Sequence, residues 1–148
     1  MTLLIPVKIL ENGVGLDLPS YATAGSAAMD LRAAIGGSLL LHRHERALVP
    51  AGIAIALPVG YCADIRSRSG LAHKNGITVL NSPGTVDSDY RGELKVLLVN
   101  FGDDFMIERG MRIAQLLISK YESVGWEEAD SLEETSRSSG GYGSTGIR

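Results

Sequence analysis

Residues 81–96 read NSPGTVDSDYRGELKV, and the interpretation of the whole chain starts from this stretch. An apolar run typical of a β-strand precedes it at residues 77–80, and a second one begins near its end at residues 94–99. Between the two runs lie proline, glycine, serine and aspartate, which are the residue types that build turns. The stretch therefore predicts a β-hairpin with a polar tip.

The tip of this hairpin carries residues that could perform chemistry. Asp87 and Asp89 are two positions apart, so on extended backbone both carboxylates would face the same way. One carboxylate could act as a general base, and Tyr90 offers a flat apolar ring with a hydroxyl. The alternative is a solvated turn, in which aspartate and serine are ordinary residues, and composition alone favours it.

The composition is that of a soluble globular protein with one domain. The chain has 148 residues, of which 45% are hydrophobic and 21% are charged. A net charge of −3 gives no basic field for nucleic-acid backbone, and the single cysteine excludes an internal disulfide. No leader and no apolar run of about 18 residues is seen, so we expect no membrane partner and a cytoplasmic protein.

Short apolar runs separated by turn residues about every ten positions predict an all-β sandwich or barrel. Strands are expected at residues 3–10, 28–33, 39–41, 47–49, 53–57, 61–66, 77–80, 94–99 and 111–120. The last could be a helix by propensity, but its Ile and Leu content and the β context favour a strand. One short helix is expected at residues 68–75, ended by Gly76.

Two features point beyond a simple monomeric domain. The runs 94–99 and 111–120 are apolar on both faces, as in strands buried inside a domain or against another subunit. From residue 127 the chain is acidic and then rich in serine and glycine, so it has little to bury. We therefore predict a β-domain over residues 1–126 and a flexible C-terminal arm over residues 127–148.

Residues 81–96 closely resemble the third signature motif of the trimeric dUTP pyrophosphatases (dUTPases), which convert dUTP to dUMP and pyrophosphate. Four other stretches resemble the remaining motifs, in the family's order along nearly the whole chain. They are 27–33 (AAMDLRA), 68–72 (RSGLA), 110–117 (GMRIAQLL) and 137–146 (RSSGGYGSTG). The resemblance implies a jelly-roll-like distorted barrel with one short helix, and a glycine-rich arm that closes over bound nucleotide as a lid.

The second and fourth motifs fit the phosphates of such a substrate. Arg68 supplies a planar cationic donor, and Ser69 supplies a hydroxyl. The backbone N–H groups of Ser69 and Gly70 begin the short helix, whose N-terminus favours an anion. A surface helix capped by its serine is the alternative. The resemblance assigns Gln115 to the phosphate side, and the alternative is a hydrogen-bonded core amide.

The third motif fits the base and the reaction. Asn81 has both donor and acceptor atoms for the edge of uracil, and Tyr90 resembles the aromatic residue that packs against the deoxyribose. Asp87 takes the role of the general base for water attacking the α-phosphorus. The other positions that the resemblance assigns to substrate binding in this motif are Thr85, Val86 and Lys95.

The fifth motif repeats the phosphate-binding chemistry on a flexible segment. Arg137 could pair with a terminal phosphate, and the ring of Tyr142 could stack on the base. Gly143, Ser144 and Thr145 could offer backbone N–H and hydroxyl donors. The segment is not a P-loop, because no Gly-Lys-Ser/Thr follows.

The implied cofactor is Mg²⁺, with Asp30 as an outer-shell ligand that binds it through water. Mg²⁺ keeps most of its waters and binds substrate phosphates, so one such aspartate is sufficient. Asp30 could instead be a surface carboxylate or a cap. His42 and His44 could share a face, but with no third ligand nearby surface histidines are the simpler interpretation.

Ser67 and Ser138 depart from the family pattern, in which proline often precedes RSG and glycine often follows the arm arginine. Tyr142 stands where phenylalanine is more usual. None of these changes removes a group that the reaction needs.

The resemblance thus implies a Mg²⁺-dependent homotrimer that hydrolyses dUTP at sites between subunits, keeping uracil out of DNA and supplying dUMP for thymidylate synthesis. One alternative is an enzyme like dCTP deaminase, which would need a different base reader. A non-catalytic nucleotide-binding trimer has no need of a base at Asp87. A purely structural β-domain would make five ordered motifs coincidental.

Overall fold

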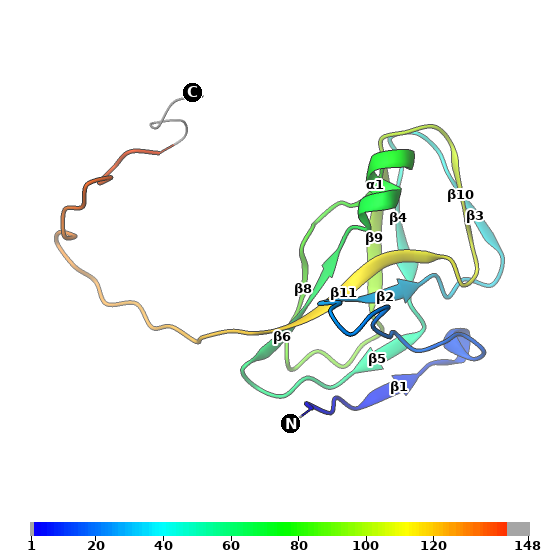
Figure 1. Cartoon of the computed structure of the whole chain (residues 1–148), viewed down its shortest axis with the longest axis horizontal. Coiled ribbons are helices and arrows are strands. Elements are labelled where there is room, and N and C mark those ends of the chain that lie inside the picture. The colour runs from blue at the N-terminus through cyan, green and yellow to red at the C-terminus, as the bar shows by residue number, and fades with distance from the viewer. Residues whose placement is uncertain (1, 142–148) are drawn as a thin grey trace.

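The computed structural model describes residues 2–141 and consists mainly of short antiparallel strands (Figure 1). The strands are β1 (Val7–Ile9), β2 (Met29–Arg32), β3 (Ser38–Leu41), β4 (Arg46–Pro50), β5 (Ile53–Ile55), β6 (Tyr61–Arg66), β7 (Ile77–Val79), β8 (Gly84–Val86), β9 (Lys95–Asn100), β10 (Phe105–Glu108) and β11 (Arg112–Lys120). A 3₁₀ turn, η1 (Glu11–Gly13), and one α-helix, α1 (Ser69–Asn75), complete the regular structure. The all-β prediction with one short helix is confirmed.

The strands pair in four sheets. The largest has the order β2-β11-β6-β8, and a second has the order β4-β9-β7. Two strand pairs, β1-β5 and β10-β3, complete the set. In Figure 1, α1 lies at one end of the molecule and the β1-β5 pair at the opposite end.

The core is formed by the inward-facing side chains of these sheets. Leu31, Val49, Leu98, Ile107 and Ile113 are almost completely buried, each on a different strand. The alternate burial along β4 and β10 places one apolar face of each of these strands in this core. Burial of such side chains is the main source of the domain's stability.

Asn100 is a buried polar residue that closes one end of the core. Its amide nitrogen donates to the carbonyl oxygens of Leu41 and Asp103, both at 2.8 Å. Its amide oxygen accepts from the backbone N–H of Gly102 at 2.8 Å. The bond to Leu41 joins the end of β9 to the end of β3, and the other two lie within the β9-β10 connection. The amide is therefore satisfied, as buried polar groups must be.

Most expected elements are present, and the ambiguous residues 111–120 form the longest strand, β11. The helix is confirmed at Ser69–Asn75, and Gly76 ends it with a φ of 69°, in the left-handed region that favours glycine. β7 and β9 pair as the predicted hairpin, with Ile77 opposite Asn100.

The connection within this hairpin is not the simple polar turn that was expected. It contains β8, which leaves β7 and β9 and pairs with β6 in the other sheet, with Thr85 opposite Asp64. The hairpin tip is therefore held by both large sheets. A three-residue strand between turn residues has too little periodicity to be recognised from its own sequence.

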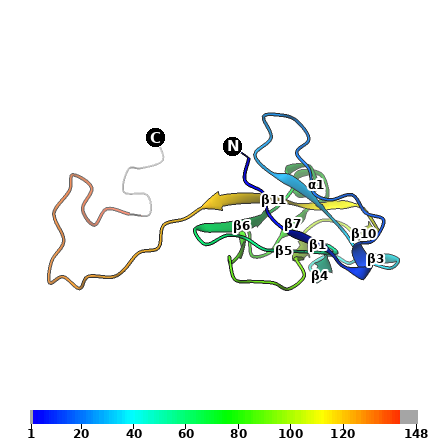
Figure 2. The ribbon, with the colours of Figure 1, turned by 90° about the horizontal axis from the view of Figure 1, so that it is seen from below.

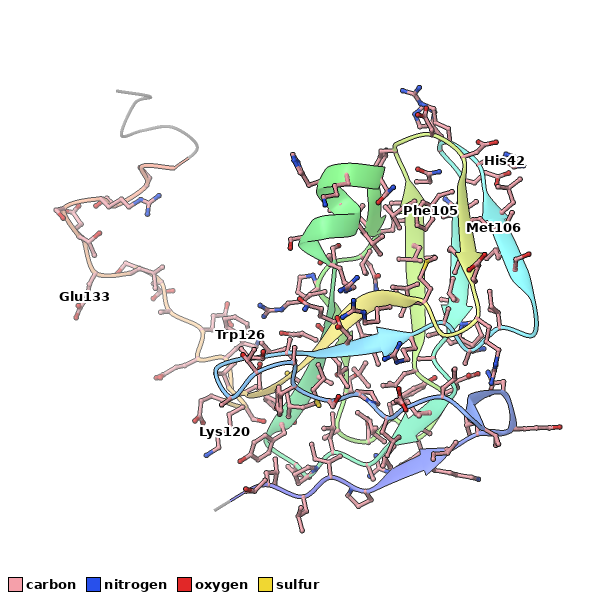
Figure 3. All side chains as sticks on the ribbon, turned by 45° about the vertical axis from the view of Figure 1, so that its right-hand side comes forward. His42, Phe105, Met106, Lys120, Trp126 and Glu133 are labelled. Carbon is pink, nitrogen blue, oxygen red and sulfur yellow. The ribbon has the colours of Figure 1, made fainter. Side chains whose placement is uncertain are left out.

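The chain leaves the domain after β11. The backbone N–H of Tyr121 donates to the carbonyl of Gly60 at 3.0 Å, and residues 121–141 then run without a helix or strand. Figures 1 and 2 show this segment pointing away from the sheets, and Figure 3 shows Trp126 and Glu133 along it. Trp126 is 97% exposed. Among residues 2–141, no helix is long and apolar enough to span a bilayer.

Candidate active site

A pocket of about 360 Å³ lies at the hairpin formed by β7, β8 and β9. Its lining residues are Leu48, Ile65, Val79, Asn81, Gly84, Thr85, Val86, Asp87, Tyr90, Glu93, Leu94, Lys95 and Leu97. Every hairpin residue that the sequence predicted for substrate binding is among them. Apolar side chains and a few polar groups together are typical of a pocket for a small organic ligand.

Asp87 directly follows β8 and begins a turn, in which the N–H of Tyr90 donates to the carbonyl of Asp87 at 3.2 Å. The backbone from Asp87 to Asp89 is therefore not extended, so the condition under which both carboxylates would face the same way is not met. Asp87 lines the pocket, and Asp89 is not among the lining residues. The structure thus distinguishes one carboxylate of the pair as the candidate base.

Tyr90 is fixed at the edge of the pocket. Its hydroxyl donates to the backbone carbonyl of Glu93 at 3.0 Å. Gly92 makes this possible, because a Cβ at that position would overlap the hydroxyl and the ring of Tyr90. This hydrogen bond holds the partly exposed ring at the rim of the pocket, where it can contact a ligand.

Glu93 anchors the hairpin, and the sequence interpretation missed it. One carboxylate oxygen accepts from the side-chain amide of Asn12 at 2.7 Å and from the backbone N–H of Gly52 at 3.0 Å. These partners are 81 and 41 positions away along the chain, so residue spacing could not reveal them. Its only local signal was a charged residue directly before a buried leucine, Leu94.

A second group of predicted residues lies on the side of β6 that faces away from β8 and the hairpin pocket. Arg68 is the N-cap residue of α1, and its Nε donates to one carboxylate oxygen of Asp30 on β2 at 2.9 Å. Arg112 on β11 donates to the other oxygen of Asp30 at 3.2 Å. Gln115 is opposite Asp30 in the β2-β11 register and opposite Arg66 in the β6-β11 register. The sequence interpretation had not included Arg112.

The start of α1 differs from the capped surface helix that was considered as an alternative. The N-cap position is Arg68, not Ser69, and no side chain caps the helix. Ser69 and Gly70 are both exposed in the first turn. Their hydroxyl and backbone N–H groups are therefore accessible to a ligand.

In a single chain the two groups do not form one pocket. Asp30, Arg68 and Gln115 are absent from the lining of the hairpin pocket, which contains Asn81 and Asp87. The order β2-β11-β6-β8 separates the strand of Asp30 from the hairpin strand by two others. The hairpin pocket and the group around Asp30 are therefore two separate sites in a single chain.

The arm residue Arg137 does not reach either group in this chain. Its Nε donates to the carbonyl of Gly140 at 2.9 Å. Ser138 has a φ of 39°, a conformation that favours glycine, which is consistent with the glycine often found at this position in the family. The remaining arm positions that were assigned to the nucleotide lie outside the described residues: Tyr142, Gly143, Ser144 and Thr145.

Residues 2–141 contain no cluster of three or more His, Cys, Asp and Glu side chains that could hold a metal ion. Both oxygens of Asp30 already accept from arginines, so this carboxylate suits water-mediated contact with a cation rather than direct ligation. That arrangement fits Mg²⁺, which retains its waters and takes direct ligands from phosphates.

The exposed histidine His42 is paired with a carboxylate. Nδ1 of His42 lies 2.8 Å from a carboxylate oxygen of Asp104 (His42 is labelled in Figure 3). This hydrogen bond raises the pKa of His42 above its ordinary 6.5, and lowers the pKa of Asp104. His44 has a positive φ in the same connection between β3 and β4.

Comparison with known proteins supports the resemblance of the five motifs. The dUTPase family model matches residues 15–146. A deoxyuridine 5′-triphosphate nucleotidohydrolase of Rickettsia bellii is 60% identical over 144 residues, which cover 97% of this chain and 95% of the relative.

Solved structures confirm the fold. A dUTPase mutant of Staphylococcus bacteriophage 80alpha, solved with dUpNHpp, aligns with a TM-score of 0.88 and 23% identity over 99% of this chain and 100% of that one. A dUTPase mutant from phage phi11 of S. aureus, described with a structural Mg(II) ion, aligns with a TM-score of 0.79 and 21% identity over 89% and 100%. The extent of the model match and the identity to the Rickettsia enzyme establish that this chain belongs to the dUTPase family.

Proposed function

We infer that this protein hydrolyses dUTP to dUMP and pyrophosphate. The observation that carries the inference is the hairpin pocket, whose lining includes the Asp87 carboxylate, the Asn81 amide and the hydrogen-bonded ring of Tyr90, while its other carboxylate, Glu93, is bonded to Asn12 and Gly52. The pocket has the apolar lining and the few polar groups that a nucleoside needs. Because the chain belongs to the dUTPase family, dUTP is the expected substrate.

We assign the roles in the reaction as follows. The Asp87 carboxylate removes a proton from water as its oxygen bonds to the α-phosphorus. The bond from that phosphorus to the oxygen bridging to the β-phosphate breaks, and pyrophosphate leaves with the electron pair. Arg68, Gln115 and the arm residue Arg137 bind the phosphate oxygens and offset their charge.

Selectivity for deoxyuridine is assigned to the hairpin. Asn81 pairs with the uracil edge, and the Tyr90 ring packs on the deoxyribose and leaves no space for a 2′-hydroxyl. Thr85, Val86 and Lys95 complete the lining. The hydrogen bond from Tyr90 to the Glu93 carbonyl keeps the ring from yielding to a larger sugar.

We propose Mg²⁺ as the cofactor, held by substrate phosphates and by Asp30 through water. When bound, it would neutralise charge on the phosphates. Asp30→Asn should raise the Mg²⁺ concentration needed for half-maximal activity several-fold, because the aspartate's charge is lost near the ion. Activity measured against Mg²⁺ concentration at saturating dUTP tests this. A higher KM for dUTP with an unchanged Mg²⁺ requirement would restrict Asp30 to positioning its two arginines.

We propose that the active form is a homotrimer with its sites between subunits. Two observations support a partner copy. The residues assigned to the phosphates, Asp30, Arg68 and Gln115, are separate from the hairpin pocket in one chain. The arm also exposes Val124, Trp126 and Leu132, which is unfavourable for apolar side chains in an isolated chain. Sedimentation at micromolar concentration should give a trimer, and a monomer that retains full activity would contradict the proposal.

Product analysis tests the function directly. Pyrophosphate release is measured from dUTP, dCTP, dTTP and UTP with Mg²⁺, and release from dUTP alone is expected. Ammonia released from dCTP would indicate the deaminase relative. Tight dUTP binding without release would indicate a nucleotide-binding trimer. In the cytoplasm the proposed activity would keep uracil out of DNA and supply dUMP for thymidylate synthesis.

A further inference from the structure

The loop between β6 and α1 is tied to β7 by one side chain. The hydroxyl oxygen of Ser67 accepts from the backbone N–H of Val79 at 2.9 Å. It also lies 2.6 Å from the hydroxyl oxygen of Thr78, close enough for a hydrogen bond in either direction. Ser67 and Thr78 are both half-buried, so water competes only partly for these bonds.

The helix α1 itself contributes few contacts that would hold its start in place. No residue of the helix is fully buried, and no side chain caps its N-terminus. Leu71 packs against the core from a half-buried position. The helix has only two turns, so its own hydrogen bonds do not fix where it begins. The bonds of the Ser67 hydroxyl to β7 are therefore a direct constraint on the backbone next to Arg68.

Arg68 is thereby held from two directions. Its side chain contacts Asp30 on β2, and its backbone follows the residue that is bonded to β7. A shift of the backbone would move the guanidinium away from the position where Asp30 now holds it. Displacement of a binding group by about 1 Å can cost 10²-fold in rate.

We propose that Ser67 is a positioning residue for the phosphate side of the active site, acting through Arg68 and the first turn of α1. The proposal rests on the proposed function. Where many family members restrict this position with proline, this chain uses two hydrogen bonds to β7. Proline would fix φ but could not accept from the Val79 N–H.

The test compares variants that lack a hydroxyl with variants that keep it. Ser67→Ala removes both bonds and should lower kcat/KM for dUTP by about 5- to 20-fold, and Thr78→Val removes only one bond and should lower it by less. The double variant should lose little more than Ser67→Ala, because that change already breaks both bonds. Ser67→Thr and Thr78→Ser retain a hydroxyl and should recover most of the activity.

Binding measurements separate this role from a general loss of structure. Calorimetry with inorganic pyrophosphate should show weaker binding to Ser67→Ala, and binding of deoxyuridine should be unchanged. Ile107→Val is the matched stability control, since Ile107 is fully buried on β10 and does not line the hairpin pocket. It should lower Tm without changing pyrophosphate affinity.

Wild-type pyrophosphate affinity in Ser67→Ala would overturn the inference. An equal loss of deoxyuridine affinity would also overturn it, because the hydroxyl would then act on the hairpin. Pyrophosphate affinity is measured without turnover. Failure of the wild type to hydrolyse dUTP therefore refutes the proposed function, and the binding result still decides the role of Ser67.

Discussion

Asp87→Asn is expected to lower kcat for dUTP hydrolysis by about 10²- to 10⁴-fold, the range that a general base contributes. The amide has nearly the shape of the carboxylate but cannot take a proton from water. Binding should change little, because the apolar lining of the pocket, Asn81 and Tyr90 remain. Steady-state pyrophosphate release, with dUTP affinity measured separately, gives both quantities.

Asp89→Asn is the matched control. It removes the same charge two residues away, from a side chain outside the lining of the pocket. We expect kcat close to that of the wild type. A comparable loss in both variants would mean that the local charge, not a base at Asp87, drives the reaction. Full activity of Asp87→Asn would contradict the assignment of Asp87 as the general base.

The candidate site was predictable where its parts are local in sequence. Proline, glycine and aspartate between two apolar runs were sufficient to predict the hairpin that carries Asn81, Asp87 and Tyr90. The RSG turn into a short helix could also be predicted, because Gly76 ends it with the expected left-handed conformation. In both cases the signal lies within about ten residues and depends on turn chemistry.

What could not be predicted depends on pairing between distant residues. β8 is recognisable only beside β6, and β10 only beside β3. Arg112 lies with the residues assigned to the phosphates because β11 pairs with β2. This pairing brings Arg112 to Asp30, which is 82 positions away along the chain. Long-range register of this kind is set by the packed fold, and propensity and periodicity carry little information about it.

The same reasoning explains why Glu93 was missed and why it matters. Its carboxylate joins the hairpin to Asn12 and to Gly52, which lies in the turn between β4 and β5. The position of Tyr90 thus depends on a turn that is distant in sequence. Gly52 itself is in close contact with Gly13 of η1, so this junction has no room for larger side chains.

Gly52→Ala is therefore expected to be strongly destabilising, costing about 2–5 kcal/mol. Gly52 has a φ of 71°, where an alanine is strained. The added Cβ would also overlap the Cα of Gly13 and lie 2.8 Å from the Cβ of Ala34. Chemical denaturation at a fixed protein concentration measures the loss, since the stability of an oligomer depends on concentration.

Gly60→Ala separates the two causes of this loss. Gly60 has a similar φ of 87°, but nothing lies within 4 Å of the position that a Cβ would take. Gly60→Ala should lower the free energy of unfolding only by the cost of placing alanine in a left-handed backbone conformation, about 1–2 kcal/mol. Equal losses in the two variants would show that the contact with Gly13 relaxes freely.

A larger loss in Gly52→Ala, with a raised KM for dUTP at temperatures where it is folded, would show that this junction positions the hairpin. The KM rises in that case because the Gly52 N–H is one of the two donors that hold Glu93, and the Glu93 carbonyl in turn holds Tyr90.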